Sequence, residues 1–226
     1  MTTLINLVAT RSRDGDHAAM FRWYSDHVHL LMGFAALQRA TLYRQSGTVP
    51  AQDGPEYLCL YEFPSHGDFL AFEVSAARAQ AQHVVQTGWA RTGLEIVQRT
   101  QYLRLGQRRS GGTAAGADAL HHIQTLALGA GPLPGVARWM ADRVHCTCGG
   151  PGFGAAAWHR AWDATDAGGD ALVVAENCVQ DTAGTTPLLP APWQTGDRAE
   201  DVIGQAPATV AVRWQGAYRQ LCSWAR

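Results

Sequence analysis

The spacing of hydrophobic and polar residues predicts alternating strands and helices along the first half of the chain. Short apolar or alternating runs predict strands over 3–10, 37–45, 56–63 and 94–105. Apolar residues at close to helical spacing predict a helix over 17–32, and a stretch rich in Ala, Gln and Arg predicts a second helix over 65–86. The predicted order of the first half is therefore β-α-β-β-α-β.

The second half repeats this order with one change. Strands are predicted over 121–128, 155–163, 170–180 and 209–221, and a helix over 136–145. The second helix is degraded, because residues 182–192 contain three prolines and only 195–203 could form a turn or two of helix. If the two halves enclose a ligand cavity, we expect this change to alter its mouth.

A repeated motif supports a duplication. The pattern RWxxDxVH starts at Arg22 and again at Arg138, a shift of 116 residues (138 − 22), and Tyr102 and Tyr218 differ by the same shift. An internal repeat of this kind carries more weight than any local motif. A Gly- and Ala-rich stretch separates the copies. We predict a first repeat over 1–106, a linker over 107–117, and a second repeat over 118–226 with a degraded second helix.

The order β-α-β-β-α-β is that of the ferredoxin-like motif. Its antiparallel sheet carries helices on one face only, so the other face must be covered. Two fused copies can cover each other by packing these open faces together. The predicted fold class is α+β, with two tandem ferredoxin-like βαββαβ repeats whose antiparallel sheets pack into an α+β barrel around a small-molecule cavity.

Two segments carry a resemblance to a known superfamily. The sequence from Trp23 to Arg44, beginning WYSDHV, and the sequence YLCLYEFPS over 57–65 resemble the dimeric α+β barrel proteins. The resemblance covers most of 3–105 and returns, weaker, over 120–222. That superfamily includes polyketide cyclases, antibiotic-biosynthesis monooxygenases that are cofactor-independent or flavin-assisted, muconolactone isomerases, EthD-like proteins and haem-degrading enzymes. Its single-domain members dimerise to close the barrel, whereas a tandem chain can close it alone. Pairing of two tandem chains into a homodimer remains an alternative.

Composition limits the classes of partner. The chain has 226 residues, is 46% hydrophobic and 16% charged, and has a formal net charge of −1. This balance gives no electrostatic case for binding nucleic acid or an anionic membrane. No apolar run approaches the roughly 20 residues that span a bilayer, and the N-terminus lacks the regions of a signal peptide. With five scattered cysteines, we expect a reduced cytoplasmic protein.

Histidines on the first helix are candidates for acid–base chemistry. His27 matches the histidine of the Trp-x-x-x-His segment in the resembling superfamily, and Arg143 takes its place in the second repeat. His29 is instead the histidine that the repeat retains, as His145. Histidine is the natural general acid or base near neutral pH. The alternative is a helix-end or interface residue that is hydrogen-bonded to the backbone.

The first strand of each repeat carries a polar residue among apolar ones. Asn6 and His122 are equivalent by the shift of 116, and Gln124 lies on the same strand face as His122. If the intervening apolar residues face the helices, Asn6 and His122 face the barrel cavity. We expect catalytic roles there for both residues, and a substrate-binding role for Gln124. The alternative is a polar pair that is hydrogen-bonded across the barrel.

Further residues are candidates for binding an aromatic substrate. Glu62 shares a strand face with Leu58 and Leu60, so its carboxylate must be solvated, paired or shifted in pKa. The alternative for Glu62 is an ion pair with Arg39 at the barrel rim. Four aromatic residues are candidate stacking walls or, equally, core residues: Tyr43, Tyr102, Trp158 and Trp162.

The sequence predicts no metal and no resident cofactor. The segment His145-Cys146-Thr147-Cys148 lacks the second ligand pair of a zinc site. Flavin and haem remain alternatives. The resemblance to haem-degrading enzymes implies an axial histidine and a tryptophan on the second helix and an asparagine on the first strand. Asn6 fits, and His83 lies in about the right part of the second helix. The register is one residue off, however, because Gln82 takes the histidine position and Phe72 the tryptophan position.

These observations predict a tailoring enzyme of natural-product biosynthesis that acts on an aromatic or polyketide-like small molecule. The preferred reaction is cofactor-independent acid–base chemistry: cyclisation, isomerisation or decarboxylation, which need proton transfers and a pocket that holds the substrate. The first alternative is a cofactor-independent or flavin-assisted oxygenase of the same fold. The second is a ligand-binding protein without catalysis.

Overall fold

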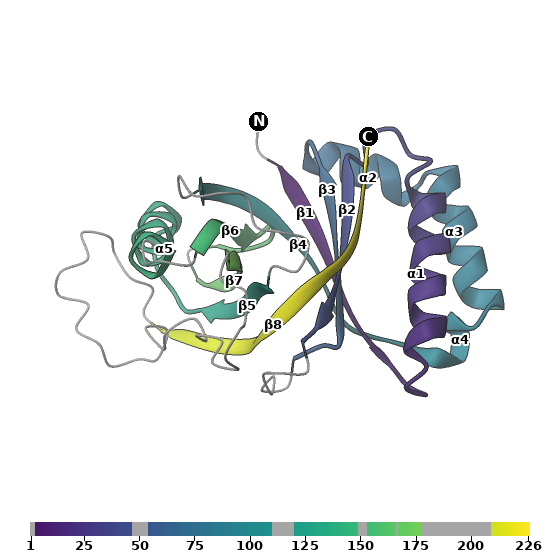
Figure 1. Cartoon of the computed structure of the whole chain (residues 1–226). Helices are drawn as coiled ribbons and strands as arrows, with labels where there is room; N and C mark the ends of the chain where they lie inside the picture. The colour runs from purple at the N-terminus through teal and green to yellow at the C-terminus, as the bar shows by residue number, and fades with distance from the viewer. Residues whose placement is uncertain (1–2, 47–53, 110–119, 149–152, 166, 178–208) are drawn as a thin grey trace. The chain divides into compact units, whose positions relative to one another are not determined.

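The computed structural model describes residues 3–46, 54–109, 120–148, 153–165, 167–177 and 209–226 (Figure 1). Its elements, in chain order, are β1 (Leu4–Ser12), α1 (His17–Leu31), β2 (Arg39–Gln45), β3 (Tyr57–Phe63), α2 (His66–Glu73), α3 (Ala76–Thr87), α4 (Ala90–Gly93), β4 (Leu94–Arg109), β5 (Leu120–Leu128), α5 (Leu133–Cys148), β6 (Phe153–Ala161), β7 (Gly169–Asn177) and β8 (Val210–Ala225).

The hydrogen-bonded strand order is β1-β3-β2-β8-β5-β7-β6-β4, and it closes into a barrel. This order confirms the predicted α+β barrel of two ferredoxin-like repeats. The predicted strands are present with ends shifted by a few residues. β4 continues through Arg109, so the first three residues of the predicted linker belong to a strand. The degraded second helix predicted within 182–203 lies outside the described residues.

The chain divides into two compact units. The first unit comprises Met1–Arg44, Pro55–Gln101 and Leu221–Arg226, and the second comprises Gln45–Gly54 and Tyr102–Gln220. The long strands β4 and β8 therefore contribute to both units. No helix within the described ranges is both long and apolar enough to cross a membrane.

In the first unit, β3 lies between β1 and β2, and both pairs are antiparallel. Helices α1 and α3 lie beside each other on one face of these strands (Figure 1). Helix α1 begins at Asp16, whose side chain accepts a hydrogen bond from the Ala19 amide at 2.8 Å. Its buried residues recur at helical spacing and form the inner stripe: Met20, Tyr24, His27, Val28 and Leu31. The predicted helix over 17–32 is thus confirmed.

The single helix predicted over 65–86 is instead two helices, α2 and α3. The break lies at Ser75, which has an extended backbone and whose hydroxyl accepts a hydrogen bond from the Arg78 amide at 3.2 Å. The same hydroxyl donates to the Phe72 carbonyl at 2.7 Å. Serine favours such local bonds over a continuous helix. The helical propensity of the surrounding Ala, Gln and Arg residues does not show this break.

In the second unit, β5 pairs with β7 on one side and β8 on the other. Helix α5 covers one face of this sheet. Its Val136, Trp139 and Met140 are buried in a cluster with Leu126 and Val173 from the strands. The predicted helix over 136–145 is therefore present and slightly longer.

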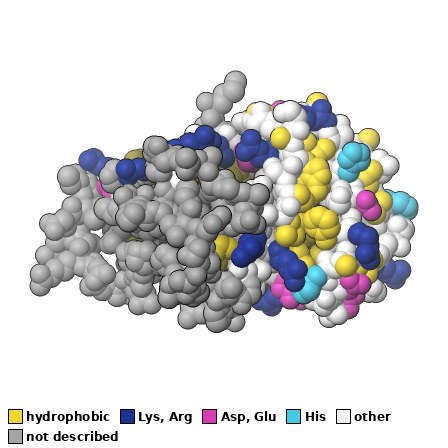
Figure 2. Space-filling view, viewed as in Figure 1, with side chains coloured by type: hydrophobic (Ala, Val, Ile, Leu, Met, Phe, Trp, Pro, Cys, Tyr) yellow, Lys and Arg dark blue, Asp and Glu magenta, His cyan; other side chains and the backbone are white. Residues whose placement is uncertain are grey.

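The surface of the first unit mixes apolar and charged side chains. On the face shown in Figure 2, hydrophobic side chains gather in the described part, with basic and acidic side chains around them. Exposed apolar residues of this unit include Leu70, Val74 and Ile96. Isolated apolar residues are normal on a protein surface and by themselves identify no partner.

Candidate functional site

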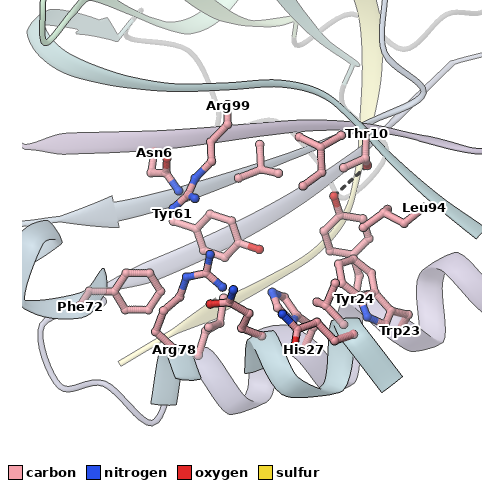
Figure 3. A pocket seen from close by; sticks show the side chains of 16 residues that line it. Asn6, Thr10, Trp23, Tyr24, His27, Tyr61, Phe72, Arg78, Leu94 and Arg99 are labelled. Carbon is pink, nitrogen blue, oxygen red and sulfur yellow. Dashed lines mark hydrogen bonds between the residues drawn. The ribbon is translucent and has the colours of Figure 1, made fainter. Parts of the chain in front are cut away.

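A cavity of about 240 Å³ lies within the first unit, between its strands and helices α1, α2 and α3 (Figure 3). Side chains from β1, β3 and β4 form one side, and side chains from the three helices form the other. A volume of this size lies just below the usual range for ligand pockets, roughly 300–1,000 Å³. The cavity therefore suits a compact ring system.

Asn6 lies on this cavity, on the helix-covered face of β1. Asn6, Val8 and Thr10 all line it, and Asn6 is directly opposite Tyr61, which lines it too. The expectation that Asn6 faces the barrel interior is therefore wrong. Both faces of β1 are largely apolar, and strand alternation separates two faces without saying which one the helices cover.

An aromatic row from α1 forms one wall of the cavity. The Trp23 ring stacks on the His27 ring, with centroids 4.7 Å apart and planes at 21°. It also meets Tyr24 edge-on, with centroids 4.8 Å apart. The Tyr24 hydroxyl is 2.8 Å from the Thr10 hydroxyl on β1, which ties the helix to the strand (Figure 3). Residues at i and i+4 of a helix share a face, so Trp23 holds the orientation of His27.

His27 is buried and neutral at physiological pH. Burial, and next the positive charge of Arg78, lower its pKa to about 4, against a hydrogen bond with the Ala81 backbone that favours the charged form. Nδ1 has no hydrogen-bond partner among the described residues. His27 thus holds a nitrogen lone pair that can accept a proton.

Three residues that line the cavity have buried polar atoms with no hydrogen-bond partner in the described part of the chain: Asn6 Oδ1, Trp23 Nε1 and His27 Nδ1. Each such atom costs about 1–3 kcal/mol when it stays unpaired. Buried polar atoms in native proteins are normally satisfied, so a group of exceptions requires an explanation. A bound molecule with polar groups would satisfy all three atoms.

Two arginines also line the cavity, and the sequence analysis did not single them out. Arg78 comes from α3 and Arg99 from β4. Both donate to the same oxygen of Glu73, Oε1, at 3.4 Å and 2.6 Å respectively. Arg78 and Arg99 are 21 positions apart on different elements, so no local motif relates them.

His122 and Gln124 lie in the second unit and do not line this cavity. His122 is directly opposite Ala175, which belongs to the core cluster beneath α5. The expectation that His122 faces the barrel interior is therefore wrong for the same reason as for Asn6. Burial, and next His121, lower the pKa of His122 to about 4. The Gln124 side-chain amide donates to Gln215 Oε1 at 3.1 Å.

The aromatic residues proposed as stacking walls lie elsewhere. Trp158 packs against the core cluster beneath α5. Tyr43 and Tyr102 are buried in strands β2 and β4, and Trp162 is 42% exposed just after β6. None of these four residues lines the cavity of the first unit.

Glu62 also lies outside this cavity. Its Oε1 is 3.9 Å from Nη1 of Arg39, the residue opposite it on β2. This is the ion pair weighed as the alternative to substrate binding. His29, on the outer side of α1, is exposed, and the side chain of His145 lies outside the described residues.

The residues on α3 do not fit an axial ligand for haem. Gln82, Val85 and Gln86 line the cavity, whereas His83 is exposed and does not. Among the described residues that line the cavity, the one imidazole is that of His27 on α1, and its ring stacks on Trp23. The lining that α3 gives this cavity therefore does not fit haem held by an axial histidine. Within the described ranges, no group of three or more His, Cys, Asp or Glu side chains could hold a metal ion.

No protein-family model matches the chain, and no curated protein sequence matches it. Its fold is similar to a candidate monooxygenase from Fusobacterium nucleatum, with a TM-score of 0.60 and 10% identity over 100% of this chain and 95% of that one. It is similar to an anthrone oxidase-like protein, with a TM-score of 0.60 and 10% identity over 99% and 92% of the two chains. It is also similar to a variant chlorite dismutase from Candidatus Nitrospira defluvii, with a TM-score of 0.55 and 8% identity over 96% and 90%.

The strand order and these similarities agree on one class. The chain has the fold of the dimeric α+β barrel superfamily, with two ferredoxin-like repeats in a single polypeptide. At identities of 8–10%, the similarities establish the fold and leave the reaction to the residues of the cavity.

Proposed function

We propose that this chain is a small-molecule oxygenase that oxidises a compact aromatic substrate at an acidic C–H bond, with His27 as the base. The observation that carries the proposal is the group of unpartnered atoms on one cavity: Asn6 Oδ1, Trp23 Nε1 and His27 Nδ1. An aromatic wall and a neutral imidazole together suit a flat substrate that loses a proton.

The first step is proton transfer from carbon. Nδ1 of neutral His27 takes the proton, and the electron pair of the C–H bond stays on the substrate as a delocalised carbanion. Asn6 Oδ1 accepts a hydrogen bond from a substrate hydroxyl, and Trp23 Nε1 donates one to a substrate oxygen. These contacts hold the carbon against the base, which is the main contribution of a shaped pocket.

Dioxygen is the second substrate. The carbanion transfers electrons to O2 and forms a C–O bond, and the resulting peroxide takes the proton back from His27. Loss of water then leaves a carbonyl group on the ring. A CH2 group and one O2 thus become C=O and H2O, with the substrate oxidised and dioxygen reduced. This sequence needs no resident cofactor.

The names of two structural neighbours support this choice of reaction. One is described as a candidate monooxygenase and another as anthrone oxidase-like. An anthrone is a tricyclic aromatic ketone with an acidic CH2 group, which matches the required chemistry. Cyclisation, isomerisation or decarboxylation would share the first proton transfer, and these reactions differ from oxygenation in that they consume no dioxygen.

The test is aerobic incubation of the purified chain with anthrone, with dioxygen uptake measured by electrode and quinone formation by absorbance. We expect one dioxygen per quinone, at a rate above the protein-free control. His27→Ala should lower kcat/KM by about 10²–10⁴-fold, the usual contribution of a general base. The matched control is His29→Ala, which removes an exposed imidazole from the same helix and should leave the rate unchanged.

Two results would contradict the proposal. Full oxidation by the His27→Ala variant would exclude this residue as the base. Conversion of an aromatic substrate by the native chain without dioxygen uptake would exclude the oxygenase and favour the cyclase, isomerase or decarboxylase reaction.

A further inference from the structure

One end of the cavity is positively charged. Figure 3 shows the guanidinium groups of Arg78 and Arg99 on the side of Asn6 and Phe72, whereas Trp23 and Tyr24 lie toward the opposite side. All these residues line the cavity, and among the described residues no acidic side chain lines it. The cavity therefore has a cationic end and an aromatic end.

The two guanidinium groups are only partly neutralised. Both bond to one oxygen of one carboxylate, Glu73 Oε1, and within the described part of the chain neither has another hydrogen-bond partner. Each arginine has five N–H donors, so most donors stay available. Two positive charges and one negative charge leave about one net positive charge at this end. The side chains are partly buried, at 20% exposure for Arg78 and 33% for Arg99, so solvent screens that charge incompletely.

We propose that Arg78 and Arg99 form the binding site for a carboxylate on the substrate, so that the substrate of this cavity is an aromatic acid. The guanidinium fork matches a carboxylate with two parallel hydrogen bonds, which a single phenolate oxygen cannot form. The contacts with Glu73 show that both guanidinium groups donate to a carboxylate oxygen, and they hold the two groups in position. The proposal rests on the proposed function for the chemistry at the other end of the cavity.

This arrangement also orients the substrate. A carboxylate at the cationic end places the ring system along Tyr61 and directs its far edge toward Trp23 and His27. Contacts at both ends of the cavity place one C–H bond of the substrate against the base. A neutral substrate of the same shape lacks the contact at the cationic end and binds in several orientations.

The test compares two probes of nearly equal shape, 1-naphthoate and 1-naphthamide, by isothermal titration calorimetry at pH 7.5. The native chain should bind 1-naphthoate at least about tenfold more tightly than the neutral amide, the scale expected for one charge-assisted pair. The double variant Arg78→Gln/Arg99→Gln should lose this preference and keep its affinity for 1-naphthamide. The matched control is Arg22→Gln, which removes an exposed charge of α1 that does not line the cavity.

A second variant, Glu73→Gln, tests the same site independently, in case the double variant does not fold. It keeps the shape of the side chain and removes the competing negative charge, so affinity for 1-naphthoate should rise severalfold. Thermal denaturation identifies any variant that fails to fold. Equal affinity of the native chain for the two probes would overturn the proposal, as would a preference that survives in the folded double variant or an unchanged affinity in folded Glu73→Gln.

The outcome is separate from that of the oxygenase test. These titrations need no turnover and no dioxygen. Selective binding of 1-naphthoate without oxidation of any aromatic substrate would leave the carboxylate site and remove the oxygenase. Oxidation of anthrone by a chain that binds the two probes equally would leave the oxygenase and remove the carboxylate site.

Discussion

Close approach of an aromatic ring to a glycine sets the packing at one point of the second unit. The ring of Trp158 lies over Gly106 so closely that a Cβ atom added there would be 2.3 Å from it. Trp158 also packs against the core cluster beneath α5, so the ring cannot move without opening that core. Gly106 is therefore required for its small size, and its backbone conformation is ordinary.

We predict that Gly106→Ala lowers the free energy of unfolding by about 1–3 kcal/mol, the usual cost of overpacking. Chemical denaturation measures it. The control is Gly67→Ala at an exposed position of α2, where the nearest atom to the new Cβ would be 3.6 Å away and alanine should be neutral or slightly stabilising. Equal denaturation midpoints for native and Gly106→Ala chains would show that Trp158 moves freely.

At this scale the sequence singled out part of the cavity lining. His27 and Asn6 both line the cavity, although Asn6 lies on the helix-covered face of β1 and not in the barrel interior, and their catalytic roles stay predictions. Arg78 and Arg99 were not, because arginines on a polar helix and on an alternating strand look like ordinary surface residues. Their common feature is the shared contact with Glu73, and such a contact between elements exists only in the folded chain.

A single serine separates the two helices that cover this cavity. The Ser75 hydroxyl accepts from the Arg78 amide and donates to the Phe72 carbonyl. It thus ends α2, starts α3 and sets the direction in which Arg78 leaves the backbone. The pattern of residues 65–86 predicts helix throughout, because helical propensity is summed over a window and one capping hydroxyl barely changes the sum.

Replacing this cap should weaken both the fold and the cationic end of the cavity. We expect Ser75→Ala to lower the free energy of unfolding by about 0.5–2 kcal/mol, as for other N-cap residues, and to reduce the preference for 1-naphthoate. Thermal denaturation and titration measure the two effects. Ser75→Thr retains the hydroxyl and should resemble the native chain. If Ser75→Ala and Ser75→Thr behaved alike, the hydroxyl would have no capping role.

Buried histidines make the stability of the whole molecule depend on pH. Burial is the largest cause that lowers the pKa of four histidines, of which His121 is half-buried: to about 4 for His27, His121 and His122 and to about 3 for His159. In the unfolded chain each pKa is near 6.5. Between these values the unfolded state binds more protons than the folded state, so stability falls as the pH is lowered.

We therefore expect acid destabilisation to begin near pH 7, to be steepest near pH 5, roughly midway between the folded and unfolded pKa values, and to level off as the pH falls through about 4. Each histidine contributes a slope of at most about 1.4 kcal/mol per pH unit. Urea denaturation at pH 7.0, 5.5 and 4.5 measures the slope. His159→Gln should flatten it, and His29→Gln, an exposed control, should not. An unchanged slope in folded His159→Gln would contradict the assignment.

The sequence alone determined the order of elements, the duplication and the α+β barrel class. These follow from periodicity, from turn-forming residues and from the repeated motif at Arg22 and Arg138, all of which are local properties of the chain. The positions of His27 and Trp23 on one face of α1 follow from helix geometry in the same way.

Only the tertiary structure decided where the cavity lies. Both faces of β1 are apolar enough to be buried, so the packing of the helices, and not the strand itself, decides which face lines the cavity. The meeting of Arg78, Arg99 and Glu73 was likewise decided by packing between α3, β4 and the end of α2. Alternation and propensity act within an element, whereas a binding site depends on which elements the fold brings together.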